Sequence, residues 1–349
     1  MKSDFVFRVS ERWPSCHSST ICTLPKGGLA VAWFAGSKEG SSDSAVLISK
    51  KVDSKNWSSP ETLVNVAHKA AGNPKLFRGR KADELRIIAP VNYGEWCDGG
   101  TRLFMKRSFD GGGSWTDLEI LWDGTGILGK NRPIKLTDGT WILPVEKESE
   151  WRPAFLRSQD YGESWNLIEV PSGKEKVIQP AIVELSNGNL LAYARSWEGK
   201  IYRMISSDKG LSWSKPGPTK LPNNNSGIDM IRLHSGNLLL AFNDTALGEG
   251  KRANGERQWG PRNPLSLALS TDEGASWSYK IDIEKKKMNN NGKYHEDLQN
   301  IEVPAKGEFS YPSLIQDPNG IIHVVYTYER TAIKHLMATE DELFDREQA

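Results

Sequence analysis

Short apolar runs separated by polar turns follow one another along the whole chain. Six of these runs begin directly after a turn rich in Gly, Asn, Asp or Ser. These turn-strand markers lie at residues 27–31, 83–87, 138–142, 187–191, 235–239 and 319–322. Apolar runs this short, bounded by turn-forming residues, predict β-strands rather than helices. We therefore expect an all-β protein.

A second repeated pattern lies between the markers. The sequence Ser-x-Asp-x-Gly-x-Ser-Trp occurs without a mismatch at residues 108–115, 158–165, 206–213 and 270–277. A degraded copy at residues 49–57 keeps Asp53 and Trp57. In such a turn the Asp and Ser side chains bond the local backbone, Gly allows a positive φ, and Trp fills the apolar layer beneath. The pattern predicts a hairpin turn that recurs in each structural unit.

Six markers with five boxes predict six four-stranded blades, and hence one six-bladed β-propeller over residues 1–349. The expected blades are 15–65, 70–122, 130–170, 177–220, 226–284 and 309–335. The strand around residues 5–9 is expected to complete the last blade and so close the ring without a free edge. Two polar insertions, residues 244–262 and 285–308, are expected to be surface loops.

Composition supports this fold and narrows the partners. Thirteen Trp, 32 Gly and 18 Pro in 349 residues suit many short strands joined by tight turns. Because 45 Lys and Arg balance 44 Asp and Glu, we expect neither nucleic acid nor a membrane as partner. Three Cys without metal-like spacing predict no disulfide framework. Residues 1–10 lack the apolar core of a signal peptide, which indicates a cytoplasmic protein, or a secreted or periplasmic one if a leader was trimmed.

The eight-residue repeat resembles the Asp-box of the sialidase family, also called the BNR repeat, and the resemblance runs along nearly the whole chain. It implies a sialidase-like propeller. Asp-boxes lie away from the catalytic face of that family, so they indicate a fold better than a reaction. Sialidases bind the substrate carboxylate with three Arg, use a Tyr assisted by Glu as nucleophile, and use an Asp as acid/base.

The resemblance places four of these groups. Arg195 ends an apolar strand as the family's second Arg does, and Arg262 precedes the fourth box as its third Arg does. Guanidinium forks suit this task because they match a carboxylate in bidentate geometry. The nucleophile position falls on Tyr311, just before the sixth marker, and the acid/base position falls on Asp43 in a Gly/Ser loop.

Two positions depart from the family. The first Arg is replaced by His17, and Arg12, five residues earlier, could take its place only if the loop were displaced. The Glu that assists the Tyr is replaced by Gln179, which removes the expected base. His17 titrates near neutrality as a free side chain and is therefore a second catalytic candidate.

Polar residues at the blade entrances extend the candidate site. We expect the entrances to converge on the mouth of the central channel, where amides, carboxylates and guanidinium groups suit sugar hydroxyls. The candidates for substrate binding, besides the two Arg, are Asn131, Arg132, Glu146, Asn225 and Asp229. No metal or redox cofactor is expected, and the oligomeric state is left open.

Three functions fit these residues. The first is a glycoside hydrolase that resembles exo-sialidases and releases an acidic sugar from the non-reducing end of an oligosaccharide or glycoconjugate. The second is a uronic-acid-directed lyase or a rhamnosidase on the same fold, which His17 and Gln179 fit better. The third is a propeller that binds glycans without catalysis.

Overall fold

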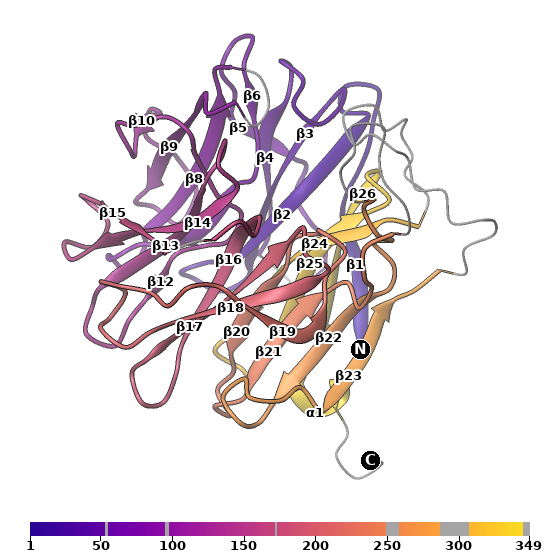
Figure 1. Cartoon of the computed structure of the whole chain (residues 1–349). Helices are drawn as coiled ribbons and strands as arrows, with labels where there is room; N and C mark the ends of the chain where they lie inside the picture. The colour runs from indigo at the N-terminus through magenta and orange to yellow at the C-terminus, as the bar shows by residue number, and fades with distance from the viewer. Residues whose placement is uncertain (53–54, 95–97, 172, 249–257, 287–306, 345–349) are drawn as a thin grey trace.

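The computed structural model is an all-β, six-bladed propeller, which confirms the predicted fold class (Figure 1). It describes residues 1–52, 55–94, 98–171, 173–248, 258–286 and 307–344. The residues expected in the two polar insertions lie largely outside these ranges, as do Asp53 of the degraded box and Cys97. Neighbouring strands are antiparallel in every sheet.

The first three blades follow one another along the chain. Blade 1 comprises β2 (Ser15–Thr23), β3 (Leu29–Gly36), β4 (Ala45–Lys51) and β5 (Glu61–Val64). Blade 2 comprises β6 (Ala70–Ala71), β7 (Lys75–Arg78), β8 (Leu85–Asn92), β9 (Thr101–Ser108) and β10 (Glu119–Ile120). Blade 3 comprises β11 (Ile127–Leu128), β12 (Ile134–Lys135), β13 (Trp141–Lys147), β14 (Arg152–Ser158) and β15 (Asn166–Glu169).

The remaining blades complete the ring. Blade 4 comprises β16 (Val177–Glu184), β17 (Leu190–Ser196), β18 (Lys200–Ser206) and β19 (Gly217–Pro222). Blade 5 comprises β20 (Asp229–Arg232), β21 (Leu238–Phe242), β22 (Leu265–Ser270) and β23 (Tyr279–Glu284). Blade 6 comprises β24 (Phe309–Gln316), β25 (Ile322–Tyr328), β26 (Ala332–Ala338) and β1 (Lys2–Arg8), and a short helix, α1 (Glu340–Leu343), follows it.

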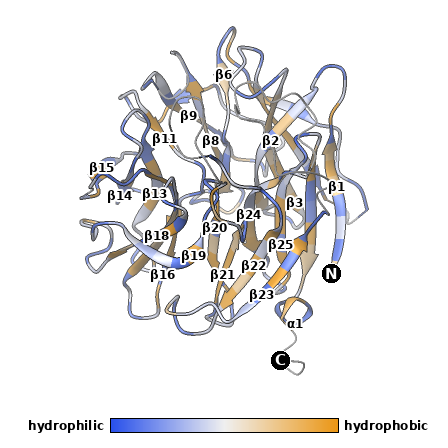
Figure 2. Cartoon of the chain, turned by 45° about the vertical axis from the view of Figure 1, so that its right-hand side comes forward, coloured by the Kyte–Doolittle hydropathy of each residue, from blue (hydrophilic) through white to orange (hydrophobic). Residues whose placement is uncertain are grey.

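The hydrophobic core is divided among the spaces between neighbouring blades. Buried side chains form six clusters, and each cluster combines strands of two adjacent blades. Figure 2 shows the apolar residues along the strands and the polar ones in the turns. Trp213 of the third box, for example, stacks on Phe155 of blade 3 with ring centroids 3.9 Å apart. The box tryptophans therefore bind neighbouring blades together.

The four exact boxes share one hydrogen-bond pattern. In the first, Ser108 Oγ accepts from the N–H of Gly112 at 2.8 Å and donates to Asp110 Oδ1 at 2.7 Å. Ser114 donates to Asp110 from its backbone N–H at 2.9 Å and from Oγ at 2.7 Å. In blades 2 and 3 the first strand is interrupted, into β6 and β7 and into β11 and β12. With each of these pairs counted as one strand, every box follows the third strand of its blade, which is β9, β14, β18 or β22. Because first and third strands run in the same direction, the boxes lie at the opposite face from the entrances of the inner strands.

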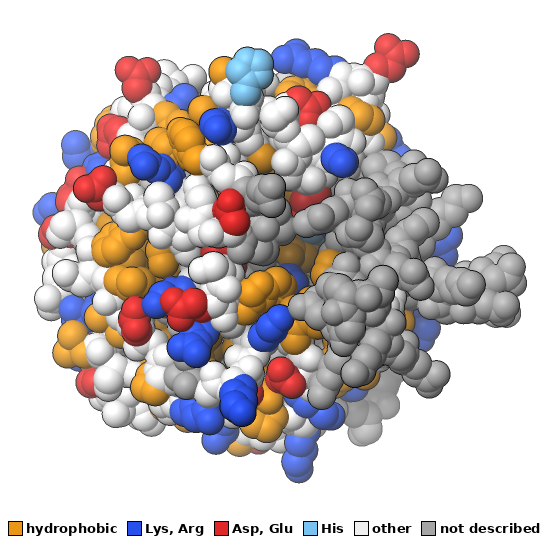
Figure 3. Space-filling model, turned by 45° about the horizontal axis from the view of Figure 1, so that its top comes forward, with side chains coloured by type: hydrophobic (Ala, Val, Ile, Leu, Met, Phe, Trp, Pro, Cys, Tyr) orange, Lys and Arg blue, Asp and Glu red, His pale blue; other side chains and the backbone are white. Residues whose placement is uncertain are grey.

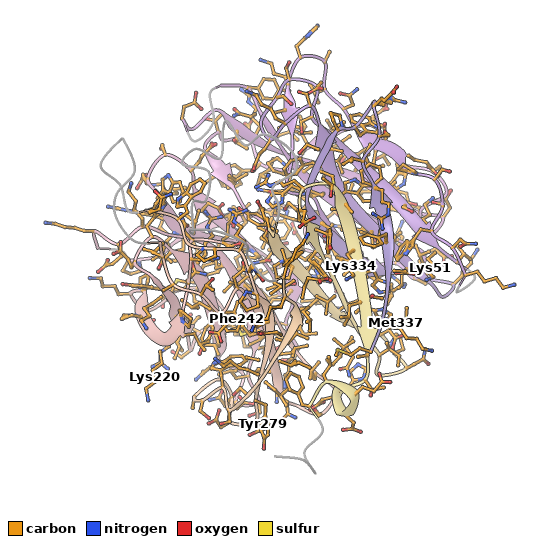
Figure 4. The ribbon with its side chains drawn as sticks, turned by 90° about the vertical axis from the view of Figure 1, so that its right-hand side faces the viewer. Lys51, Lys220, Phe242, Tyr279, Lys334 and Met337 are labelled. Carbon is orange, nitrogen blue, oxygen red and sulfur yellow. The ribbon has the colours of Figure 1, made fainter. Side chains whose placement is uncertain are left out.

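The N-terminal strand closes the ring. β1 pairs with β26 on the outer edge of blade 6. Lys51 of blade 1 forms an ion pair with Asp4 of β1 at 2.5 Å, and Lys334 of β26 forms one with Glu284 of blade 5 at 2.5 Å. Figure 4 labels both lysines at this seam. Ion pairs thus link blade 6 to blade 1 on one side and to blade 5 on the other. In the part of the chain that the structure describes, no helix is long and apolar enough to cross a membrane.

Candidate active site at the entrances of the inner strands

Three inner strands carry a bulge at the same level of the channel. β2, β16 and β24 each shift register next to their entrance, and there Ser18, Gln179 and Tyr311 adopt φ of 54°, 55° and 52°. Non-glycine residues in this left-handed region are strained, and such strain is concentrated at functional sites. The bulges bring His17, Gln179 and Tyr311, from blades 1, 4 and 6, to one end of the channel.

Tyr311 lies at the centre of this group and is buried. Its phenol oxygen accepts a hydrogen bond from Arg195 Nη1 at 2.5 Å. The same nitrogen donates to Gln179 Oε1 at 3.1 Å, while Arg195 Nε donates to Asn225 Oδ1 at 2.9 Å. A cationic donor at the phenol oxygen stabilises negative charge there. Arg195 is therefore held by two amide side chains in a position to assist a reaction at Tyr311.

Cations surround the Tyr311 ring. The guanidinium carbons of Arg262 and Arg195 lie 5.4 and 5.9 Å from the ring centroid, and Lys130 Nζ lies 5.8 Å from it. Arg262 Nη1 is also paired with Glu308 at 2.8 Å. Such a concentration of positive charge in a buried site favours an anionic ligand.

His17 packs against Tyr311, with ring centroids 4.2 Å apart. Its Nδ1 lies 2.8 Å from Thr327 Oγ1, and its Nε2 has no hydrogen-bond partner among the described residues. Burial, and then the positive charges of Arg330, Arg262 and the other nearby cations, hold the pKa of His17 well below its usual value. The imidazole is therefore neutral at neutral pH, and burial and the nearby cations make it a weaker base than a free imidazole.

Below this cluster two side chains of blade 3 close the channel. Lys130 Nζ donates to Pro312 O at 2.6 Å, to Asn131 Oδ1 at 2.9 Å and to Ile228 O at 3.1 Å. Arg132 reaches Ile21 O at 3.1 Å and also donates to Leu314 O. Blade 3 is thereby tied to blades 1, 5 and 6 across the centre of the ring.

Other predicted binding residues lie near Lys130 and Arg132. Asn131 donates to Pro180 O at 3.0 Å, directly beneath the bulge of Gln179. Asp229 accepts from the N–H of Leu314 at 2.8 Å. Both residues, together with Arg132, line a cavity of about 460 Å³ that opens toward the Asp-box face. Arg132 and Asp229 thus bond channel walls rather than the Tyr311 group.

Asp43 is bound into its own loop rather than to the Tyr311 group. Its carboxylate accepts from Ser37 N at 3.0 Å, from Ser37 Oγ at 3.0 Å and from Ser41 Oγ at 2.5 Å. Partial burial opposes ionisation, but these hydrogen bonds, from Ser41 first and then from Ser37, lower the pKa of Asp43 overall. Arg12, the displaced alternative to His17, is exposed and lies 5.1 Å from the ring of Trp13.

Comparison with known proteins agrees with the propeller fold. Residues 27–324 match the family model described as a BNR repeat-like domain. The chain belongs to the sialidase-like BNR repeat family.

Several proteins that are similar to this chain are named as sialidases. The anhydrosialidase of Macrobdella decora is 24% identical over 250 residues, which are 68% of this chain and 30% of that protein. A Hadza microbial sialidase superposes with a TM-score of 0.78 at 16% identity, covering 98% of this chain and 69% of the other. The intramolecular trans-sialidase of Ruminococcus gnavus gives 0.71 at 16% identity, covering 97% and 98%. The BNR repeat-like chain thus spans about 30% of the curated relative, and the structural matches show a shared fold.

The structure adds charged groups to the site of this BNR repeat-like protein that sequence reasoning missed. Arg330 and Glu308 are buried beside His17 and Arg262, and Glu39 contacts Arg330 from the loop after β3. Lys75 is fully buried near Glu146. An available pattern was the X-Pro step near the entrances. Asn73-Pro74 directly precedes β7, and Gln179-Pro180 and Tyr311-Pro312 lie at the bulges of β16 and β24.

In the described ranges, no group of three or more His, Cys, Asp or Glu side chains is arranged to hold a metal ion. On the face shown in Figure 3, basic and acidic side chains are interspersed without a large patch of either sign.

Proposed function

We propose that the protein is an exo-acting glycosidase that releases an acidic sugar from the non-reducing end of a glycan. The observation that carries this proposal is the convergence of Arg195, Arg262 and Lys130 within 6.0 Å of the buried Tyr311 ring. A carboxylate is the sugar substituent that such a pocket would bind. The similar proteins named as sialidases, anhydrosialidase and trans-sialidases support an acidic sugar.

In this proposal Tyr311 attacks the anomeric carbon and Arg195 stabilises the charge that develops on its oxygen. Gln179 cannot take up the phenol proton, because an amide is no base at neutral pH. We assign that proton to His17, whose neutral ring contacts Tyr311 and whose Nε2 has no hydrogen-bond partner among the described residues. We assign the protonation of the leaving oxygen to Asp43 on its match to the family position. Because the hydrogen bonds of its loop lower its pKa, Asp43 must take up a proton before it can act as this acid. The substrate carboxylate binds Arg195 and Arg262.

Product analysis by mass spectrometry tests the proposal. Wild type, Tyr311→Phe and the control Tyr279→Phe, whose residue lies on the outer strand β23 (Figure 4), are incubated with sialosides and with uronic-acid oligosaccharides. We expect wild type and Tyr279→Phe to release a free sugar acid, or its anhydro form if the transfer is intramolecular. Tyr311→Phe should release no product from either class of substrate. Loss of activity in both variants, or in neither, would contradict the role of Tyr311.

The neutral His17 supports a second candidate, a uronate lyase. There Arg195 and Arg262 would bind the uronate carboxylate, His17 Nε2 would remove the proton beside it, and Tyr311 would protonate the leaving oxygen. The product would carry a carbon–carbon double bond that absorbs in the ultraviolet. Absence of any product, with retained binding of acidic oligosaccharides, would instead indicate a glycan-binding propeller.

A further inference from the structure

Arg330 lies in the turn between β25 and β26, on the last blade, and is 3% exposed. Glu329 and Arg330 both adopt a left-handed backbone, with φ of 50° and 56°. Arg330 O accepts from the N–H of Cys16 at 3.0 Å, which places the turn beside the entrance of β2. Two consecutive strained residues persist only where the surroundings hold them. The turn thereby places the Arg330 side chain next to His17.

Carboxylates hold two of the three nitrogens of this guanidinium. Arg330 Nε donates to Glu308 Oε1 at 3.1 Å, and Nη1 donates to Glu39 at 2.6 Å. Nη2 is buried and has no partner among the described residues. Because buried guanidinium donors without an acceptor are unfavourable, Nη2 marks a place for an oxygen of a ligand.

Glu308 binds both Arg330 and Arg262 and so fixes their relative position. Its Oε1 accepts from Arg262 Nη1 at 2.8 Å, from Arg330 Nε at 3.1 Å and from Ser310 Oγ at 2.7 Å. Two guanidinium groups therefore share one carboxylate oxygen, and Arg330 Nη2 remains for a further contact. Such a shared anchor fixes the two cations in one arrangement at the side of the pocket occupied by His17.

We propose that Arg330 supplies the third guanidinium of the anion pocket, with Nη2 donating to the carboxylate that Arg195 and Arg262 also bind. Position 17 carries a neutral imidazole, so the charge comes from the β25–β26 turn instead of the inner strand of blade 1. Lys130 does not fill this role, because all three of its N–H groups already have oxygen acceptors. This inference rests on the proposed function in one respect, which is that the ligand is a sugar acid.

Binding of a free sugar acid and of its uncharged amide tests this role without requiring catalysis. Titration calorimetry is carried out with N-acetylneuraminic acid, glucuronic acid and the corresponding amides. The proteins compared are wild type, Arg330→Gln, Glu39→Gln, and the control Arg203→Gln on the exposed face of β18. The double variant Arg330→Gln/Glu39→Gln removes one charge of each sign, so it keeps the balance of the pocket if the single variant fails to fold.

We expect Arg330→Gln and the double variant to bind the acid about 10- to 100-fold more weakly, since a charge-assisted bond is lost, with little change for the amide. Glu39→Gln and Arg203→Gln should retain the preference for the acid. An unchanged preference in the Arg330 variants would overturn the inference while the product assay could still support the glycosidase. Failure of wild type to bind any of the acids would also overturn the inference about Arg330. The proposed function is decided by the product assay alone.

Discussion

Arg195 of blade 4 donates a hydrogen bond to the phenol oxygen of Tyr311 of blade 6 across 2.5 Å. The contact spans the channel mouth and places a permanent positive charge at the atom proposed to attack the substrate. A guanidinium cannot take up the proton that this atom must lose, because it is always protonated. The reaction therefore needs a base elsewhere. An experiment can compare His17, which is present, with a carboxylate introduced in place of Gln179.

Gln179→Glu introduces a carboxylate at the position where Gln179 Oε1 now accepts from Arg195 at 3.1 Å. We expect kcat to rise by at least about tenfold, since a positioned base contributes on the order of 10²–10⁴-fold. Steady-state kinetics on an aryl glycoside of the sugar acid identified by product analysis measure the change. Gln179→Met, which has a similar length and no charge, is the control. Equal kcat values for the two variants would show that no further base is needed beside His17.

Asp43→Asn tests the predicted general acid. If Asp43 protonates the leaving oxygen, the variant should lose about 10²–10⁴-fold in kcat on a natural glycoside and far less on an aryl glycoside with a good leaving group. Exposed Asp117→Asn is the matched control. Ser41→Ala removes one donor that lowers the pKa of Asp43. Because that pKa then rises, Asp43 stays protonated to higher pH, and the basic limb of the kcat profile should move upward.

A pair of opposite charges lies buried behind this site. Lys75 is fully buried and Glu146 is 1% exposed. Within the described ranges, Lys75 Nζ donates to Asn73 O at 3.1 Å, and neither carboxylate oxygen of Glu146 has a hydrogen-bond partner. Burial raises the pKa of Glu146 and lowers that of Lys75, and each charge opposes the shift of the other.

Removing one member of this pair should destabilise the propeller more than removing both. Lys75→Met leaves the Glu146 carboxylate without its opposite charge, so we expect a loss of about 3–5 kcal/mol in the free energy of unfolding. Lys75→Met/Glu146→Leu replaces both charges by apolar groups and should unfold close to wild type. Urea denaturation followed by tryptophan fluorescence compares wild type, Lys75→Met, Glu146→Leu and the double variant. Losses that simply add in the double variant would mean that the two charges do not interact.

The repeated elements of the fold are predictable from sequence because their causes are local. Ser158 and Asp160, two residues apart, form the same turn as Ser108 and Asp110, so the chemistry of each box stands in eight consecutive residues. The candidate site is predictable only where it lies on a repeated strand, as Tyr311 does. Arg330 contacts Glu39 across 291 positions of the chain, and no local pattern marks either residue. Closure of the ring decides that contact, so it becomes visible only in the folded propeller.

A line of titratable groups crosses the seam where β1 joins the last blade. His335 Nδ1 lies 2.9 Å from Asp4 Oδ1, and its Nε2 lies 2.9 Å from His323 Nδ1. His323 Nε2 in turn lies 3.5 Å from Asp317. Burial, and then the neighbouring His335, lower the pKa of His323 to about 4. Protonation of this ring is therefore unfavourable in the folded protein.

We expect the seam to weaken in mild acid. Because the folded pKa of His323, about 4, lies below its unfolded value of about 6.5, the stability contributed by the neutral ring is complete above pH 6.5. It is lost as pH falls from 6.5 toward 4, by roughly 3 kcal/mol in the free energy of unfolding. Urea denaturation at a series of pH values should show a smaller loss over this interval in His323→Gln than in wild type. The control His234→Gln, at an exposed position, should follow wild type. An identical pH dependence in all three proteins would mean that protonation of His323 does not control the pairing of β1 with the last blade. In that case the hydrogen exchange of β1 amides, corrected for intrinsic rates, would also stay constant between pH values.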